Sequence, residues 1–331
     1  MSQKRREEAI RLTSQYGVDK TAEMMGITRE TVRRYNRAED SRRGKCQLIQ
    51  NGTEQAEHQP GFENDPVLQR IAELYSPTEL KLLAQGGLPM EYKHTPVHDF
   101  TGQEIRIGYL TDTHIGSIYT DYSYIREARE IFAQEGVDIV CHVGDVTEGM
   151  SHRPGHIYEC SELGYDAQKE RATELMGEFD FCPGYVIDGN HDRWYIKSNG
   201  AKIVKDMCDQ LENWEFLGHD EGDIILGENV TLRLWHGEDG SSYAISYRLQ
   251  KILESLSGGD KPDILLTGHV HKFGHFFIRN VHTVSCGCIQ KQSKWMRGKK
   301  IEAHTGFGII DVVVNEHGVG RFKNEFFPFY A

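Results

Sequence analysis

The segment Ile105–His114 has the sequence IRIGYLTDTH and determines how the rest of the chain is expected to fold. Its first six residues, Ile105–Leu110, form a largely apolar run of the length expected for a buried strand. The polar residues Asp112 and His114 follow directly after that run. Because open α/β sheets place their ligand sites at the carboxyl ends of their strands, we expect both side chains to lie at such an edge.

The same arrangement recurs four times further along the chain. A strand-like run precedes each of four short polar motifs: Gly144-Asp145, Gly189-Asn190-His191-Asp192, His236-Gly237 and Gly268-His269-Val270-His271. If all these motifs meet at one edge, they bring together Asp112 and Asp145 with one asparagine and five histidines as candidate ligands. Such a set of nitrogen and oxygen donors is suited to two divalent metal ions and does not resemble a hydrophobic core.

A pair of metal ions is suited to the hydrolysis of phosphoesters, because the phosphate is anionic and water is a poor nucleophile. Two cations about 3.5–4 Å apart can generate hydroxide from bound water and neutralise charge on the phosphoryl oxygens. Holding them so close requires a shared anionic ligand, and the carboxylate of Asp145 can bridge them. We therefore expect a metal-dependent phosphoesterase that uses a metal-bound hydroxide.

Residues 104–315 resemble the calcineurin-like metallophosphoesterase superfamily. The resemblance rests on five blocks in the family's order, DxH, GD, GNHD, HG and GHxH, all present without substitution. It implies an α/β fold in which two packed mixed β-sheets are flanked by helices. It also implies seven metal ligands: Asp112, His114 and His271 for one ion, Asn190, His236 and His269 for the other, and Asp145 shared by both.

The donor set contains imidazoles, carboxylates and one amide but no thiolate, which suits Mn²⁺, Fe, Zn²⁺ or Ni²⁺. The resemblance implies two divalent metal ions, with Mn²⁺ supporting activity in vitro.

Three consecutive residues of the GNHD block, His191, Asp192 and Arg193, are candidates for the chemistry and for substrate binding. The resemblance implies that His191 steadies the phosphate and protonates the leaving oxygen, a task that suits a pKa near neutrality. We expect Asp192 to orient His191 by accepting its second ring proton, although it could instead cap a turn. Arg193 could hold a phosphate oxygen, or it could be an ordinary exposed arginine.

Several other polar residues lie near the motifs. We expect Thr113 and Thr147 to be structural and His142 to pack within its strand. His152 and His156 follow Asp145 on a loop that contains glycine and proline, so they either line a substrate groove or remain on the surface.

The first 45 residues predict a small all-α domain. One helix is expected at Glu7–Tyr16, ended by Gly17, and a second runs from Asp19 to Gly26. A third, capped by Thr28, presents four arginines to solvent: Arg29, Arg33, Arg34 and Arg37. Short helices joined by a glycine-containing turn form a helix-turn-helix pattern, which in DNA-binding proteins places its second helix in the major groove. The alternative is a helical appendage whose arginines are merely solvated.

Changes of composition divide the rest of the chain. Residues 46–65 are polar and predict a flexible linker, and residues 66–96 predict a helical connector that could pack on the next domain or mediate homo-oligomerisation. Residues 97–331 alternate strands and helices, as an α/β metallophosphoesterase domain would. Strands are expected at 105–110, 137–143, 185–187, 223–226, 230–235, 264–266, 276–278, 281–285, 308–314 and 321–329, and helices at 124–134, 167–179, 201–211 and 242–256.

Charge and composition limit the class of protein. The 331 residues carry a formal net charge of −12, yet residues 1–45 hold twelve Lys and Arg against seven Asp and Glu. A basic end on an acidic body indicates that this end meets a polyanion. The seven cysteines include no CxxC pair, which predicts neither a disulfide framework nor a structural zinc site. We expect no membrane segment and no secretory signal, hence a cytoplasmic protein.

The motifs also narrow the substrate. Ser/Thr phosphatases of the superfamily carry GDxxDRG and GNHE, whereas this chain has GDVTEG and ends its third block in Asp192. GNHD followed by Arg193 is similar to the break-repair nucleases and the cyclic-nucleotide phosphodiesterases of the superfamily. The repair nucleases have a histidine where Glu148 stands, and they continue into a segment that binds an ATPase. Since this chain ends soon after its last strands, we do not expect an ATPase partner.

Together with the basic N-terminal domain, these features favour a DNA nuclease hydrolysing phosphodiester bonds, with DNA as its partner. Two alternatives stay open. One is a phosphodiesterase or phosphatase acting on small molecules or cyclic nucleotides, with a regulatory N-terminal domain. The other is a DNA-binding regulator without catalysis, against which the intact ligand set argues.

Overall fold

The computed structural model describes residues 3–26, 95–151, 153–238, 244–256 and 260–330. The chain divides into two compact units, Met1–Met90 and Glu91–Ala331. The first is the N-terminal unit and the second is the α/β unit. Within the described residues, no helix combines the length and the apolar character that a membrane span requires.

In the N-terminal unit, a single helix, α1 (Gln3–Met25), occupies the region where two were expected. The prediction that Gly17 ends a helix is wrong, because the helix continues through it. A glycine inside a helix costs only about 1 kcal/mol relative to alanine, which a helix of 23 residues tolerates. Gly26 takes a left-handed φ of 64° and ends α1 as expected. The expected third helix with Arg29, Arg33, Arg34 and Arg37 lies outside the described residues, as do the linker and nearly all of the connector.

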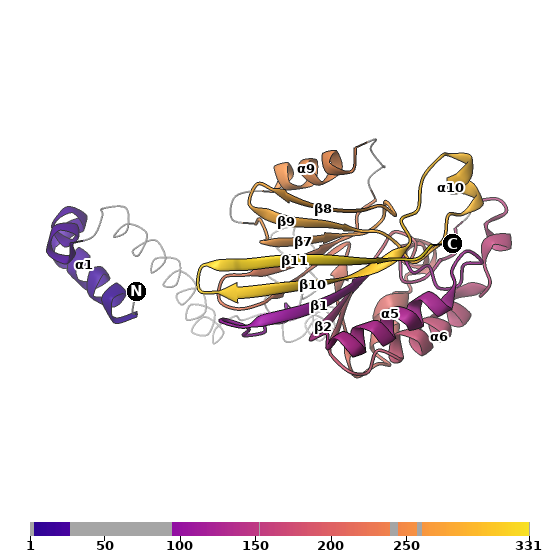
Figure 1. Ribbon diagram of the computed structural model, residues 1–331, viewed down its shortest axis with the longest axis horizontal. Coiled ribbons are helices and arrows are strands. Elements are labelled where there is room, and N and C mark those ends of the chain that lie inside the picture. The colour runs from indigo at the N-terminus through magenta and orange to yellow at the C-terminus, as the bar shows by residue number, and fades with distance from the viewer. Residues whose placement is uncertain (1–2, 27–94, 152, 239–243, 257–259, 331) are drawn as a thin grey trace, which may run out of the picture. The chain divides into compact units, whose positions relative to one another are not determined.

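In the α/β unit, a six-stranded sheet has the strand order β11-β10-β1-β2-β3-β4 (Figure 1). Its strands are β1 (Glu104–Leu110), β2 (Ile139–Val143), β3 (Gly184–Asp188), β4 (Trp214–His219), β10 (Gly306–Asn315) and β11 (Gly318–Pro328). Strands β1 to β4 run parallel to one another, and β10 and β11 extend the sheet in antiparallel fashion. The parallel register sets Leu110 opposite His142 and Val143 opposite Ile187, so the loops after β1, β2 and β3 leave the same edge.

The second sheet has five strands in the order β5-β6-β7-β9-β8. They are β5 (Glu221–Ile225), β6 (Thr231–Trp235), β7 (Ile264–Thr267), β8 (Phe273–Ile278) and β9 (Val281–Cys286). Here β6, β7 and β9 are parallel, while β5 and β8 pair antiparallel at the two edges. The expected α/β fold of two mixed sheets is therefore confirmed.

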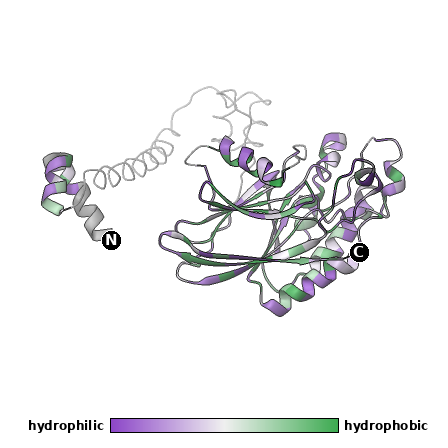
Figure 2. Cartoon of the chain, turned by 45° about the horizontal axis from the view of Figure 1, so that its top comes forward, coloured by the Kyte–Doolittle hydropathy of each residue, from purple (hydrophilic) through white to green (hydrophobic). Residues whose placement is uncertain are grey.

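The two sheets face each other across the main hydrophobic core. Ile107 and Tyr109 of β1 pack there with Leu234 of β6 and Leu266 of β7, all of them without solvent exposure. Burying one such side chain contributes about 1.5–3 kcal/mol, so this layer holds the sheets together. Figure 2 shows the hydrophobic colour concentrated along the strands, while the outer helices alternate hydrophilic and hydrophobic residues.

Helices cover the outer faces of both sheets (Figure 1). On the six-stranded sheet lie α5 (Tyr122–Glu135), α6 (Gly164–Gly177) and α8 (Ile203–Cys208), which share a second core with that sheet. On the five-stranded sheet lies α9 (Ile245–Ser255), which buries Leu253 against Leu265.

Four short elements were not predicted from the sequence: β4, the 3₁₀ turn η1 (His156–Glu159), α7 (Arg193–Asn199) and α10 (Lys294–Gly298). The strand β4 lies at the edge of its sheet and buries only Trp214 and Leu217 fully, so it lacks a continuous apolar run. Helix α10 has five residues, too few for a helical period to be recognised.

Candidate metal centre

The predicted ligand residues leave the ends of parallel strands in strained turns. Left-handed backbone angles are found at five of the seven: Asp112 (φ 50°), His114 (44°), Asp145 (49°), His269 (77°) and His271 (55°). A residue with a Cβ atom pays roughly 1–3 kcal/mol for such a conformation, and strain of this kind collects at functional sites. The strain is compatible with the fold because the core on both sides of these turns is closely packed.

Two glycines, Gly189 and Gly268, allow the loops that carry them to pack closely against neighbouring loops of the centre. A Cβ atom on Gly189 would lie 2.1 Å from Oδ1 of Asp145, and one on Gly268 would lie 2.4 Å from Oγ1 of Thr111. The loops after β3 and β7 therefore need glycine at these positions to bring their polar residues to the centre.

One group of side chains consists of Asp112, His114 and His271, whose ligand atoms all lie within 4.8 Å of one another. Oδ1 of Asp112 is 3.1 Å from Nε2 of His271 and 3.8 Å from Nε2 of His114. The two Nε2 atoms are 3.2 Å apart. All three residues are buried.

A second group consists of Asp145, His236 and His269, again with ligand atoms within 4.8 Å of one another. Oδ2 of Asp145 is 3.1 Å from Nε2 of His236, and Nδ1 of His269 is 2.8 Å from Oδ1 of Asn190. The same Oδ2 of Asp145 lies 3.7 Å from Nε2 of His114. Asp145 thus stands between the two groups.

Two of these atoms have no hydrogen-bond partner although they are buried: Oδ1 of Asp112 and Nε2 of His236. Leaving a buried polar atom unsatisfied costs about 1–3 kcal/mol. The Nδ1 atom of His236 faces the carbonyl oxygen of Val143 at 2.6 Å, so the neutral ring donates there and its Nε2 lone pair points at Asp145. Two facing acceptors require a cation or a proton between them, and the donor set therefore fits a divalent metal ion.

The titration behaviour agrees with that conclusion. Burial disfavours the charged form of Asp145, but the His236 and His191 rings outweigh it and hold the pKa of this carboxyl well below its usual range. Burial alone would lower the pKa of His236, yet the carboxylates of Asp145 and Asp112 raise it to about 9. The site thus attracts positive charge, and metal binding would displace that proton.

His191 belongs to neither of these two groups. Its Nδ1 atom lies 2.8 Å from the carbonyl oxygen of Glu148, and its backbone N–H donates to Oδ1 of Asp145 at 2.8 Å. The ring lies against Trp194, with centroids 3.9 Å apart, and burial lowers its pKa. Because Nδ1 is engaged, Nε2 is the nitrogen left for contact with a substrate.

The expectation that Asp192 orients His191 is wrong. The carboxylate of Asp192 accepts hydrogen bonds from the backbone N–H groups of Val146 (3.0 Å), Thr147 (2.8 Å) and Gly189 (2.9 Å) and from the hydroxyl of Thr147 (2.8 Å). It is buried and ties the loop after β2 to the loop after β3. The backbone carbonyl of Glu148, not a carboxylate, orients the His191 ring.

Arg193 does not face the cavity, so its predicted contact with phosphate is wrong as well. The residue is 8% exposed, and its guanidinium forms ion pairs with Asp188 at 3.3 Å, with Glu238 at 2.8 Å and with Asp220. These partners hold α7 to the loops after β4 and β6. Arg193 is not an ordinary exposed arginine either, because it is buried among three carboxylates.

Glu148 is the functional residue that the sequence did not identify. Its carboxylate contacts Nδ1 of His114 (3.0 Å), Nε2 of His156 (2.8 Å) and Nε2 of Gln290 (3.0 Å), and it is buried. A carboxylate on Nδ1 fixes the tautomer that presents Nε2 of His114 to the centre. Its place three residues after Asp145, where the repair nucleases have a histidine, was the available signal.

Three other residues near the motifs that the structure describes, His142, Thr113 and Thr147, have structural contacts. His142 is buried within β2 and contacts Oγ1 of Thr113 at 2.9 Å, and Thr147 donates to Asp192, as expected. His156 is 1% exposed and contacts Glu148. It therefore neither lines a substrate groove nor lies on the surface, the two locations expected from the sequence. His152 lies outside the described residues.

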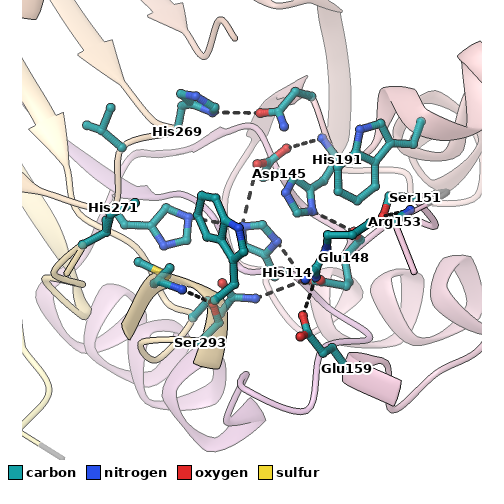
Figure 3. Close-up of a pocket in the computed structure, with 17 residues that line it drawn as sticks. His114, Asp145, Glu148, Ser151, Arg153, Glu159, His191, His269, His271 and Ser293 are labelled. Atoms are coloured by element: carbon teal, nitrogen blue, oxygen red, sulfur yellow. Dashed lines mark hydrogen bonds and ion pairs between the residues drawn. The ribbon is translucent and has the colours of Figure 1, made fainter. Parts of the chain in front are cut away.

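A cavity of about 470 Å³ opens above these groups (Figure 3). His269 and His271 lie on one side of it and Glu148, Arg153 and Glu159 on the other, with Asp145 and His114 between them. Apolar and aromatic side chains, called the aromatic wall below, also line the cavity: Trp194 of α7, Trp295 and Met296 of α10, Ile301 after α10, and Val270 from the loop after β7. The cavity therefore combines a polar floor with an aromatic wall.

Part of the chain is similar to known proteins. The family model described as calcineurin-like phosphoesterase superfamily domain matches residues 105–304. The DNA polymerase II small subunit of Methanothermobacter thermautotrophicus is 22% identical over 239 residues, which cover 59% of this chain and 49% of that protein. The chain thus spans about half the length of the curated relatives it matches.

Two solved structures are similar over about two thirds of the chain. An archaeal phosphodiesterase shares 19% identity with a TM-score of 0.40, covering 67% of this chain and 100% of that one. A phosphoesterase from E. coli shares 17% identity with a TM-score of 0.38, covering 66% of this chain and 98% of that one.

Proposed function

Because the chain belongs to the calcineurin-like phosphoesterase superfamily, we propose that it is a dinuclear metal-dependent nuclease that hydrolyses the phosphodiester bonds of DNA. The observation that carries the proposal is the pair of ligand groups that share Asp145, whose Oδ2 is 3.1 Å from one histidine and 3.7 Å from another.

In this proposal Asp112, His114 and His271 hold one metal ion, and Asn190, His236 and His269 hold the second, with Asp145 bridging them. The donor set suits Mn²⁺, and Fe, Zn²⁺ or Ni²⁺ would also fit it. When bound, such ions lower the pKa of water and neutralise charge on the phosphoryl oxygens.

His191 is the proposed proton donor. Its Nδ1–H is directed to the carbonyl oxygen of Glu148, so a proton on Nε2 faces the cavity. As the bond between phosphorus and the leaving oxygen breaks, that proton passes to the leaving oxygen. The lowered pKa makes the protonated ring a stronger acid and so favours the transfer.

The choice of DNA rests on residues 1–45 and on one relative. Arg29, Arg33, Arg34 and Arg37 belong to the helix-turn-helix pattern, and tethering such a module to the site raises the local concentration of DNA. The relative from Methanothermobacter thermautotrophicus is, by its name, a DNA polymerase subunit, which supports a DNA-related role.

A phosphodiesterase acting on small molecules is the second candidate. The cavity of about 470 Å³ lies within the range of about 300–1,000 Å³ that small-ligand pockets occupy. That volume would admit a cyclic nucleotide as well as one nucleotide of a longer chain.

The test compares cleavage of DNA and of bis-p-nitrophenyl phosphate by the full chain with Mn²⁺. A variant with Arg29, Arg33, Arg34 and Arg37 changed to glutamine should lose DNA cleavage steeply as salt is raised and keep hydrolysis of the small diester. The matched control changes four exposed cations elsewhere to glutamine: Lys205, Lys251, Arg321 and Lys323. Hydrolysis of cyclic nucleotides but not of DNA would favour the second candidate, and no hydrolysis of any diester would refute the enzyme.

A further inference from the structure

The segment of residues 291–301, called the α10 segment below, is a basic stretch within an acidic α/β unit. Residues 291–300 hold five Lys and Arg and no Asp or Glu, in a chain whose net charge is −12. Within them, Trp295 is 50% exposed. Cations interleaved with an exposed aromatic side chain are typical of surfaces that bind single-stranded nucleic acid.

We propose that the α10 segment binds a single DNA strand beside the metal centre, with an unpaired base against Trp295 and the flanking phosphates along four cations. These cations are Lys294, Arg297, Lys299 and Lys300. The inference rests on the proposed function and names its substrate more closely: a single-stranded or frayed end, not an intact duplex.

The four cations are available to a ligand. Each is exposed, and none of them forms an ion pair with any residue that the structure describes. The fifth, Lys291, differs, because its ammonium pairs with Asp121 at 3.0 Å and anchors the start of the segment. Among the described residues of the α/β unit, most surface cations form an ion pair with a carboxylate, so four unpaired ones close together in sequence are a feature of this segment.

Gln290, the residue directly before the α10 segment, contacts two residues of the candidate metal centre. The backbone N–H of Gln290 donates to the carbonyl oxygen of Asp112 at 3.1 Å, and its side chain contacts Glu148 at 3.0 Å. Gln292 closes the segment by donating to the carbonyl oxygen of Ile301 at 2.8 Å, and Ser293 caps α10 by accepting from the N–H of Met296. The segment is therefore held in a fixed position relative to the ligands.

Trp295 lines the same cavity as His114, His191 and His271. Met296, the next residue, is buried and Ile301 is half-buried, and both line the cavity together with Trp295. A base stacked on an aromatic side chain gains affinity of about tenfold or more. The phosphate of a nucleotide bound this way would lie on the polar floor and its base on the wall.

A paired base cannot use this wall, because duplex DNA presents base edges and not base faces to a protein. A cavity of about 470 Å³ has room for one nucleotide and not for a duplex. The geometry thus requires an unpaired base at the site.

Equilibrium binding of short labelled oligonucleotides, measured by fluorescence anisotropy with a chelator present, tests the inference without relying on catalysis. Changing Lys294, Arg297, Lys299 and Lys300 to glutamine should weaken binding of the single strand at least tenfold and reduce the slope against salt by about 3. The control with Lys205, Lys251, Arg321 and Lys323 changed to glutamine removes the same charge and should bind as the wild type does.

The base contact is tested by Trp295→Ala and Trp295→Phe. We expect the alanine variant to bind an intact single strand about tenfold more weakly, the phenylalanine variant to recover most of that loss, and neither to change binding of an abasic strand. A duplex should be insensitive to both changes. An oligoribonucleotide bound more tightly than the DNA would overturn DNA as the ligand.

The experiments distinguish failure of the α10 inference from failure of the proposed nuclease activity. Equal binding by the α10 variant and its control overturns the inference even if the chain cleaves DNA. Loss of single-strand binding in the α10 variant, together with no cleavage of any DNA, keeps the surface and refutes the proposed nuclease.

Discussion

The loop after β2 and the loop after β3 meet at the metal centre, yet they use their polar residues differently. In the first, Asp145 faces both ligand groups and Glu148 positions His114 and, through its carbonyl oxygen, His191. In the second, Asn190 and His191 line the cavity. The side chains of Asp192 and Arg193 instead form contacts between neighbouring loops. A residue's role therefore follows from the direction of its side chain, and neighbours within one motif can differ completely.

Asp145→Asn should have the largest effect, because the Asp145 carboxylate lies close to a histidine of each ligand group and also accepts from the N–H of His191. We expect hydrolysis of bis-p-nitrophenyl phosphate to fall more than about 10³-fold, beyond the loss seen when a single stabilising group is removed. Metal analysis should show fewer than two ions per chain. Full metal content with normal turnover would contradict the bridging role.

His191→Ala separates chemistry from metal binding. In the proposed function the ring donates a proton, and it belongs to neither of the two ligand groups beside Asp145. Turnover should therefore fall about 10²–10⁴-fold while both ions are retained. Turnover and metal content are measured on the same sample. Loss of a metal ion in this variant would show that His191 is a ligand.

Glu148→Gln tests the loop after β2 as a positioning element. The amide cannot accept from His114, His156 and Gln290 as the carboxylate does, so metal affinity should fall about 10–100-fold. Titration with Mn²⁺ measures this apart from activity. The matched control is Glu174→Gln, an exposed glutamate on α6, which should bind the metal as the wild type does.

Asp192→Asn should mainly affect stability. The new amide would face the N–H groups of Val146 and Gly189, and each unsatisfied buried donor costs about 1–3 kcal/mol. Urea unfolding measures the free energy, and turnover at low temperature should fall far less than in the His191 variant. A fall as deep as that of His191→Ala without loss of stability would restore a catalytic role for Asp192.

Arg193→Gln should have the smallest effect on activity. The side chain is paired with Asp188 and Glu238 and does not line the cavity, so KM for a small diester should change less than about twofold. The loss of these pairs should lower the melting temperature. A large rise in KM at unchanged stability would mean that the arginine reaches the substrate after all.

The sequence predicted correctly the position of residues that come directly after the end of a strand. Asp112 and His114 could be placed because an apolar run leads straight into them, and parallel strands deliver such residues to one edge. The role of Glu148 could not be placed in the same way, since its partners His156 and Gln290 come from other elements and only the tertiary fold brings them together.

The same limit explains the errors. Asp192 and Arg193 adjoin a histidine in sequence, but the turn after β3 sends their side chains away from it. Gly17 was expected to end a helix because its intrinsic propensity is poor, yet 23 helical residues outweigh one glycine. The α10 segment lacks a periodic pattern, and only the folded chain shows that it borders the metal centre.

Anomalous diffraction from crystals of the full chain grown with Mn²⁺ would show whether two metal ions share the Asp145 carboxylate. We predict two peaks about 3.5–4 Å apart, one beside Asp112 and His271, the other beside His236 and His269, with the Asp145 carboxylate between them. A single peak, or peaks away from Asp145, would contradict the shared centre on which the proposed chemistry depends.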